Sequence, residues 1–174
     1  MSVGCTAVIG AGTMGSGIAL AAATHGIEAI VVDVAKGQLE RARNYHQAQL
    51  ARGVEKGRME QEDADAAASR ITYRVEMADS AQADWAIEAA TERIEIKKDI
   101  FATMQATFGD GVVLATNTSS ISIGELASAV PGAEDRVIGM HFFNPVPVMK
   151  LVEVIKGAAT SEETTSRTIA LAEA

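Results

Sequence analysis

The sequence contains little cysteine, little proline and few aromatic residues, and its charge is unbalanced toward the acidic side. Its single cysteine, Cys5, cannot form an internal disulfide, which excludes a disulfide-stapled secreted scaffold and predicts a reducing, cytoplasmic location. With only 3 prolines and 48% hydrophobic residues, the chain is neither collagen-like nor disordered. The 15 basic residues are outnumbered by 23 acidic ones, and the net charge of −8 argues against nucleic acid as a partner.

The chain also lacks any charged residue before Glu28, and segment 7–23 contains only apolar or small residues. Such a segment can be a signal peptide or a membrane span. A signal peptide, however, needs a basic start, and no Lys or Arg precedes this segment. Its glycines also lower the hydrophobicity below what a membrane span requires. We therefore interpret it as a buried strand followed by a buried helix, and we expect no membrane association.

What the sequence does contain is an alternation of apolar runs and helical periodicities over 174 residues, enough for one domain with its own core. Strands are predicted at 6–9, 29–32, 71–75, 84–90, 112–116, 136–142 and 151–155. Helices are predicted at 14–25, 36–58, 61–69, 93–108, 122–129 and from 160 onward. This order predicts an α/β fold, a Rossmann-type doubly wound, mostly parallel sheet with a helical insertion after the second strand. The last two strands are joined too briefly for a parallel crossover, so an antiparallel pair should end the sheet.

Two S/T-x-x-E patterns, which begin at Ser122 and Thr160, predict capping boxes at the start of the last two helices. The helix that follows Thr160 is still apolar at Ile169 and Leu171, and it carries no stop signal. No later element of the sequence can cover these two side chains. We therefore expect the chain to be cut off rather than finished, and both side chains to be uncovered.

A glycine-rich loop follows the first predicted strand and opens the first predicted helix. It matches G-x-G-x-x-G as Gly10-Ala11-Gly12-Thr13-Met14-Gly15. In dinucleotide-binding loops the first glycine permits a tight turn, the second lets the backbone approach the pyrophosphate, and the third lets helix and strand pack closely. Asp33 ends the second strand, 18 residues after Gly15, where a carboxylate accepts hydrogen bonds from a ribose and repels a 2′-phosphate. An ordinary glycine turn with a solvent-facing aspartate is the alternative, but the order of the elements favours NAD as the cofactor.

His141 differs from the other histidines because it ends a predicted strand beside a proline-containing loop. His25 caps a helix and His46 lies on a helix face, so we interpret both as structural. If the last two strands form a hairpin, His141 and Glu153 are equally far from Pro147 and face each other, unless the prolines shift the register by one residue. A carboxylate on one ring nitrogen fixes the tautomer while the other nitrogen takes a proton. The alternative interpretation of this pair is a surface salt bridge.

Two longer stretches are more specific: Asn117-Thr118-Ser119-Ser120, and the run HFFNPVPVMKLVEVI from position 141 to 155. Together with the glycine loop, they resemble the NAD-binding domain of the 3-hydroxyacyl-CoA dehydrogenase family over essentially the whole chain. The resemblance implies NAD-dependent oxidation of (S)-3-hydroxyacyl-CoA to 3-oxoacyl-CoA, in fatty-acid β-oxidation or short-chain acyl-CoA metabolism. It also implies that residues 1–174 form the NAD-binding domain, that the family's C-terminal helical dimerisation domain is absent from the chain, and that the full-length enzyme is a homodimer.

The same resemblance implies roles for individual residues. His141 would be the base that removes the 3-hydroxyl proton, with Glu153 as its partner. Ser119 would hydrogen-bond the substrate oxygen, Asn144 would contact the same region, and both would also reach the cofactor. Without the resemblance, the Asn-Thr-Ser-Ser stretch is more often a turn than a site, and Glu92 and Lys97 are only a charged helix start. The remaining cofactor contacts implied are Gly10, Ala11, Gly12, Thr13, Met14, Gly15, Asp33, Glu92 and Lys97.

A basic stripe runs along the long predicted helix at 36–58, at helical spacing: Arg41, Tyr45, Gln49, Arg52 and Lys56. It is either a solvated helix face or a surface that attracts the phosphates of acyl-CoA. Gln49 and Lys56 align with CoA contacts of the family, although Gln49 stands where a hydroxyl residue is expected. Two alternatives to the full activity stay open: an NAD-binding fragment without turnover on its own, and a related gulonate-type dehydrogenase. No metal is expected.

Overall fold

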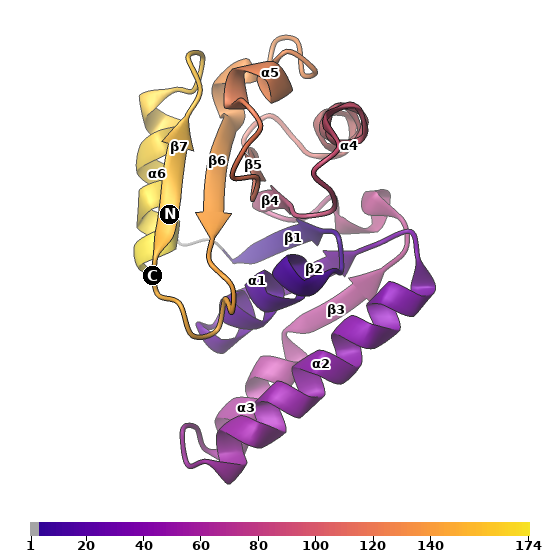
Figure 1. Cartoon of the computed structure of the whole chain (residues 1–174), viewed down its shortest axis with the longest axis vertical. Coiled ribbons are helices and arrows are strands. Elements are labelled where there is room, and N and C mark those ends of the chain that lie inside the picture. Colours follow the sequence, from indigo (N-terminus) through magenta and orange to yellow (C-terminus); the bar gives the residue numbers. More distant parts are fainter. Residues whose placement is uncertain (1–3) are drawn as a thin grey trace.

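The computed structural model describes residues 4–174, which form one seven-stranded sheet with helices on both faces (Figure 1). The strand order is β3-β2-β1-β4-β5-β6-β7, and neighbouring strands are parallel except for the antiparallel pair β6 and β7. The chain reverses its direction of travel across the sheet between β1 and β4, which is where such sheets bind ligands. The predicted doubly wound topology is confirmed. The strands are β1 Cys5–Ile9, β2 Glu28–Val32, β3 Ile71–Arg74, β4 Trp85–Glu88, β5 Val113–Thr116, β6 Val137–Phe142 and β7 Val152–Lys156.

The helices follow the predicted order, and α2 and α3 form the predicted insertion between β2 and β3. The long helix α2 ends three residues earlier than predicted, because Gly57 adopts a φ of 63° just after it and terminates the helical path. The helices are α1 Thr13–Thr24, α2 Lys36–Glu55, α3 Gln61–Ser69, α4 Ile94–Thr107, α5 Ile123–Ala127 and α6 Glu162–Glu173.

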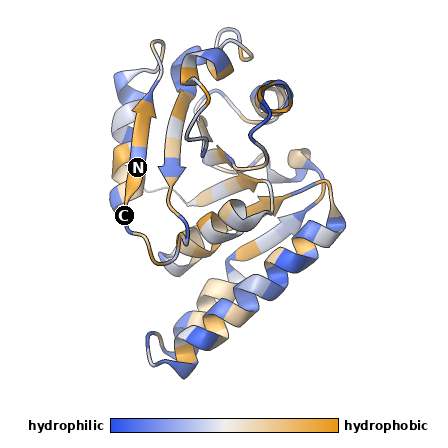
Figure 2. Cartoon of the chain, viewed as in Figure 1, coloured by the Kyte–Doolittle hydropathy of each residue, from blue (hydrophilic) through white to orange (hydrophobic). Residues whose placement is uncertain are grey.

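The core has two halves, one on each face of the sheet. In β1, Val8 packs into one cluster with α1, α2 and α3, while Ala7 and Ile9 pack into the other with α4 and α5. Because both faces are buried, the strands read as continuous apolar runs instead of alternating patterns. Figure 2 shows the consequence: orange segments gather in the central strands, and α2 is largely blue.

Both predicted capping boxes are wrong in detail, although both helices form. Ser122 is the N-cap of α5, but its hydroxyl makes no cap hydrogen bond, and Glu125 instead reaches Lys98 of α4 at 3.1 Å. The N-cap of α6 is Ser161, whose Oγ accepts an N–H from the first helical turn. Thr160 is buried and donates its hydroxyl to a carbonyl of β6 at 2.6 Å, so the cap moves on by one residue.

Helix α6 lies against β6 and β7. This contact covers one of the two α6 side chains, Ile169 and Leu171, that the sequence predicted to be uncovered. Thr164, Thr165 and Thr168 are buried on the face toward the sheet. Leu171 packs against the cluster that contains Val8, so the prediction for Leu171 is wrong. Ile169 points away from that contact and remains 43% exposed.

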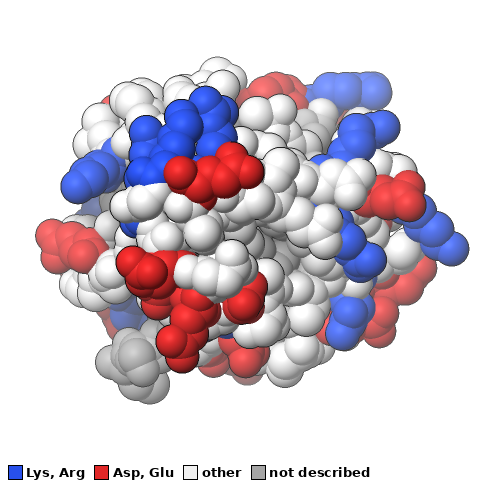
Figure 3. All heavy atoms as spheres, turned by 90° about the horizontal axis from the view of Figure 1, so that it is seen from below, with Lys and Arg blue, Asp and Glu red and all other residues white. Residues whose placement is uncertain are grey.

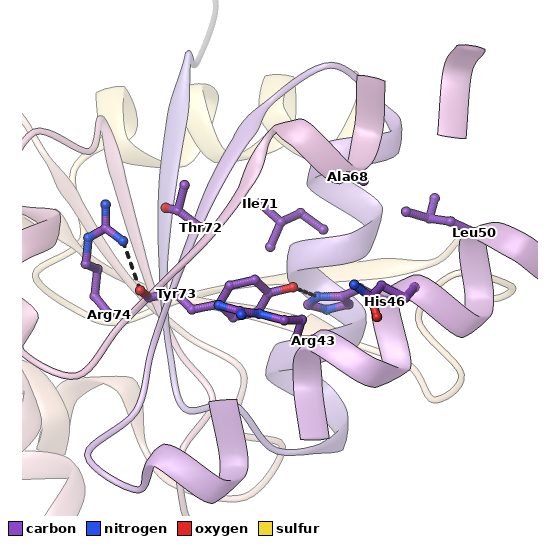
Figure 4. A pocket seen from close by; sticks show the side chains of 9 residues that line it. Arg43, His46, Leu50, Ala68, Ile71, Thr72, Tyr73 and Arg74 are labelled. Atoms are coloured by element: carbon purple, nitrogen blue, oxygen red, sulfur yellow. Dashed lines mark hydrogen bonds between the residues drawn. The ribbon is translucent and has the colours of Figure 1, made fainter. Parts of the chain in front are cut away.

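His46 ties the helical insertion to the rest of the sheet. His46 is 2% exposed, and its Nε2 lies 2.8 Å from the carbonyl oxygen of Ser16 in α1. Its Nδ1 lies 2.7 Å from the hydroxyl of Tyr73 in β3 (Figure 4). A carbonyl can only accept, so Nε2 carries the proton and Nδ1 accepts from Tyr73. A cavity of about 440 Å³ opens beside this pair, with Arg43 stacked 4.7 Å from the Tyr73 ring centroid.

We expect His46 to make the fold sensitive to acid. Burial lowers the pKa of His46 from 6.5, against a smaller raising effect of its bond to Ser16. When the pKa of a group is lower in the folded state than in the unfolded state, the free energy of unfolding is highest above the unfolded-state pKa. It decreases as the pH falls through the folded-state pKa, because the unfolded state binds the proton more readily. The free energy of unfolding, measured by urea denaturation between pH 7.5 and 5, should therefore fall less steeply with acid in His46→Leu than in the parent. Exposed His25→Leu is the matched control, and an equal change of slope in both variants would contradict the assignment.

Candidate active site

The glycine loop leaves β1 in a conformation that its glycines make possible. Gly10 has a φ of 107°, and a Cβ there would lie 2.6 Å from Cα of Ala90 in the loop after β4. A Cβ on Gly15 would lie 1.8 Å from the carbonyl oxygen of Gly10. At Gly12, by contrast, a Cβ would meet nothing within 4 Å, so the backbone there is open to a ligand. The loop thus has the open position that a pyrophosphate requires, beside the N-terminus of α1.

Asp33, directly after β2, is bonded to the glycine loop through its carboxylate. Its Oδ2 accepts the N–H of Ala11 at 2.9 Å, and its Oδ1 accepts the N–H of Ala35 at 2.9 Å. Each carboxylate oxygen has two lone pairs, so both can still accept a ribose hydroxyl. The site therefore fits a dinucleotide with a free 2′-hydroxyl.

His141 and Glu153 meet as the sequence predicts. They are direct partners across β6 and β7, so the prolines do not shift the register. Nδ1 of His141 lies 2.8 Å from Oε2 of Glu153, and the two side chains are 19% and 53% exposed. Because a carboxylate accepts, Nδ1 carries the proton and the lone pair of a neutral ring is on Nε2. The ring of Phe143 packs against the imidazole at a centroid distance of 4.7 Å.

Ser119 and His141 are brought to one edge of the sheet, since Ser119 follows β5 and His141 lies near the carboxyl end of its parallel neighbour β6. Asn117, whose role the sequence did not predict, links the two: its Oδ1 accepts the N–H of Phe142 at 2.9 Å. Ser119 and Asn144 are both exposed. The only sequence signal for Asn117 is its place at the head of the Asn-Thr-Ser-Ser motif.

The hairpin that carries His141 also rests on the helix that follows the glycine loop. Val146, in the loop between β6 and β7, is buried, and a Cβ on Gly17 of α1 would lie 2.9 Å from its Cβ. Figure 1 shows this connection running beside α1. Gly17 therefore allows the close contact that joins the two parts of the site, a role that the loop motif itself does not include.

Glu92 and Lys97 differ in exposure. The Lys97 side chain is 1% exposed, and its Nζ lies 2.5 Å from Oε2 of Glu88, which is fully buried at the end of β4. Glu92 is 60% exposed and has its Oε1 3.7 Å from the same Nζ. The sequence did not predict a role for Glu88, because this residue has the pattern of a polar end on an apolar strand. A cofactor contact by Lys97 stays a prediction.

The basic stripe lies on α2 and its C-cap residue Lys56; Arg41, Arg52 and Lys56 are exposed, and Gln49 is half-buried. Figure 3 views the molecule from the side of α2 and α3. Lys and Arg side chains stand there in separate groups with Asp and Glu between them. The face is mixed in charge, so both interpretations of the stripe stay open.

Other chemistries find no support in the part of the chain that the structure describes. No group of three or more His, Cys, Asp or Glu within 4–174 is arranged to hold a metal ion. None of the helices described is long and apolar enough to cross a membrane. Burial, followed by the charges of Glu28 and Asp84, raises the pKa of the Cys5 thiol to about 11, so this cysteine is a poor nucleophile.

This sheet order, with an open glycine loop at its switch point, defines a dinucleotide-binding domain of the Rossmann type. More narrowly, residues 5–174 match the family model of the 3-hydroxyacyl-CoA dehydrogenase NAD-binding domain, and the chain belongs to that family.

Two curated relatives illustrate the likeness. The chain is 45% identical over 166 residues to a probable 3-hydroxybutyryl-CoA dehydrogenase of Bacillus subtilis, which covers 95% of this chain and 58% of that protein. It is 44% identical over 163 residues to the 3-hydroxyadipyl-CoA dehydrogenase of Escherichia coli, covering 94% of this chain and 34% of that protein. The chain therefore spans about a third to three fifths of the length of these relatives.

A solved structure shows the same arrangement of elements. The (S)-3-hydroxybutyryl-CoA dehydrogenase of Ralstonia eutropha superposes with a TM-score of 0.95 at 40% identity, over 99% of this chain and 60% of that one. A prephenate dehydrogenase of A. aeolicus with NAD+ shares only 11% identity at a TM-score of 0.65, which supports the fold alone.

Proposed function

We propose that the protein that carries this chain oxidises (S)-3-hydroxyacyl-CoA to 3-oxoacyl-CoA with NAD. The observation that carries the proposal is the contact of 2.8 Å between Nδ1 of His141 and Glu153, at the sheet edge that also presents Ser119. Membership of the family and the names of the relatives support the substrate class.

In the proposed mechanism His141 is the general base. Its Nε2 takes the proton of the 3-hydroxyl group, and Glu153 accepts the Nδ1–H bond and stabilises the imidazolium that results. Ser119 donates a hydrogen bond to the substrate oxygen, and Asn144 contacts the same region. Bound NAD supplies the hydride acceptor for C3 of the substrate.

The cofactor would be held at the switch point of the sheet. The backbone of the glycine loop from Gly10 to Gly15 would bind the pyrophosphate, and Asp33 would bind the adenosine ribose. Glu92, Ser119 and Asn144 would line the remainder of the cofactor site, and Lys97 would contribute to it through its contact with Glu92. The open space at Gly12 supports this placement.

The proposal extends to acyl-CoA as a partner, with Gln49 and Lys56 on α2 as contacts for the CoA moiety. It also includes a helical dimerisation domain outside residues 1–174, a homodimer and a cytoplasmic location. These parts rest on the family resemblance.

The test is a steady-state assay on this chain and on any longer protein that contains it. We expect oxidation of NADH with acetoacetyl-CoA, and slower oxidation of NADPH because Asp33 repels a 2′-phosphate. Gulonate with NAD is assayed in parallel. Turnover of gulonate without turnover of acetoacetyl-CoA would replace the proposal with the gulonate alternative. Binding of NADH, seen by fluorescence titration, without turnover in any form would leave an NAD-binding module.

A further inference from the structure

The turn that carries Ser119 is held by the residue before it. Thr118 is only 3% exposed, although the next two residues, Ser119 and Ser120, are exposed. Its Oγ1 donates to Oε2 of Glu92 at 2.6 Å and accepts the N–H groups of Ser120 at 3.4 Å and Ile121 at 3.3 Å. The Thr118 hydroxyl is therefore donor and acceptor at once. It links Glu92 to the backbone of the two residues that follow Ser119.

Glu92 is in turn held by the ammonium group of Lys97. The ammonium of Lys97 lies 3.7 Å from the other oxygen of Glu92, and it is anchored by fully buried Glu88. Glu88 also accepts the N–H of Ala90 at 2.8 Å, in the loop that touches Gly10. One continuous set of contacts thus runs from the loop beside the cofactor site to the turn beside the substrate site.

We propose that Thr118 is a positioning residue, which holds Ser119 in place through its bond to Glu92. The proposal rests on the proposed function, because it gives Ser119 a substrate to meet. Nothing in the family assignment or in the names of the relatives gives Thr118 a role.

The chemistry of the contact makes positioning the expected role. A hydroxyl that donates to a carboxylate at 2.6 Å forms a charge-assisted bond, which is stronger and more directional than a neutral one. Catalytic groups must be held close to their productive geometry, and a misplacement of about 1 Å costs on the order of 10²-fold in rate. Because Thr118 is buried, it acts only through its neighbours and does not touch the substrate.

The first experiment compares Thr118→Val, which keeps the shape but loses the hydroxyl, with Thr118→Ser, which keeps the hydroxyl. We expect kcat with acetoacetyl-CoA to fall about tenfold in Thr118→Val and less than about threefold in Thr118→Ser. The KM for NADH and the melting temperature should stay close to the parent. Thr103→Val, at an exposed threonine of α4, is the matched control and should be neutral. Equal turnover of the parent and Thr118→Val would overturn the proposal.

A double-mutant cycle then asks whether Thr118 acts through Ser119. If it does, Thr118→Val should cost less than about twofold when Ser119→Ala is already present. Losses that multiply instead would mean that Thr118 acts by another route, which overturns the proposal. A Ser119→Ala variant with full turnover would overturn it as well.

Amide hydrogen exchange separates this proposal from the proposed function, because it needs no turnover. The amides of Ser120 and Ile121 should exchange several-fold faster in Thr118→Val than in the parent or in Thr118→Ser. If acetoacetyl-CoA is not turned over but these amides respond, the proposed function fails and the positioning by Thr118 stands. If the amides do not respond, the positioning fails, whatever the substrate is.

Discussion

His141→Gln should lower kcat for acyl-CoA by about 10²–10⁴-fold while leaving the affinity for NADH within about twofold. Glutamine retains an N–H that can donate to Glu153, so the hairpin keeps its cross-strand contact. What the variant loses is the Nε2 lone pair that takes the proton. The expected split, a large loss in kcat at constant cofactor affinity, follows because the glycine loop and Asp33 lie outside the hairpin.

The measurements are steady-state kinetics with acetoacetyl-CoA and a fluorescence titration with NADH. The matched control is His25→Gln, which removes an exposed histidine at the C-cap of α1 and should leave kcat unchanged. More than half of the parent activity in His141→Gln would remove His141 from the mechanism. A parallel loss of NADH affinity would show that the variant disturbs the cofactor site instead.

Much of the fold is predictable from the sequence, because parallel strands buried on both faces leave continuous apolar runs. The hairpin of β6 and β7 illustrates how far such reasoning extends. Counting residues on both sides of Pro147 pairs His141 with Glu153 if the strands form a hairpin, and the structure has this register without the one-residue shift that the prolines could have caused. The glycine loop can also be predicted from the sequence, because Gly10 and Gly15 stand where a Cβ would clash with neighbouring backbone.

The parts that the sequence did not predict depend on side chains that meet across elements. Thr160 fits a capping box by spacing, but its burial under β6 gives the cap to Ser161. Lys97 fits a charged helix start, and only the packing of α4 on β4 reveals that its ammonium is enclosed. Leu171 depends on how α6 folds back on the sheet. Local pattern carries none of this information.

The enclosed pair of Lys97 and Glu88 has a large expected effect on stability. Their contact is 2.5 Å long and almost free of solvent, and Glu88 also accepts the hydroxyl of Thr116 at 2.8 Å. Such a pair is costly to desolvate, so its presence is not itself a sign of net stabilisation. Removal of one partner, however, leaves a charge in a site that water does not reach.

We therefore expect Lys97→Met to lower the free energy of unfolding by about 3–5 kcal/mol, as measured by urea denaturation. The neighbouring Lys98→Met is the matched control: Lys98 pairs with Glu125 at the surface, and its loss should cost at most about 1 kcal/mol. The decisive variant is Glu88→Gln combined with Lys97→Met, because it removes both charges while glutamine still accepts the N–H of Ala90. If the uncompensated charge causes the loss, the double variant should regain at least half of it. A double variant no more stable than Lys97→Met would instead assign the loss to the packing of the lysine side chain.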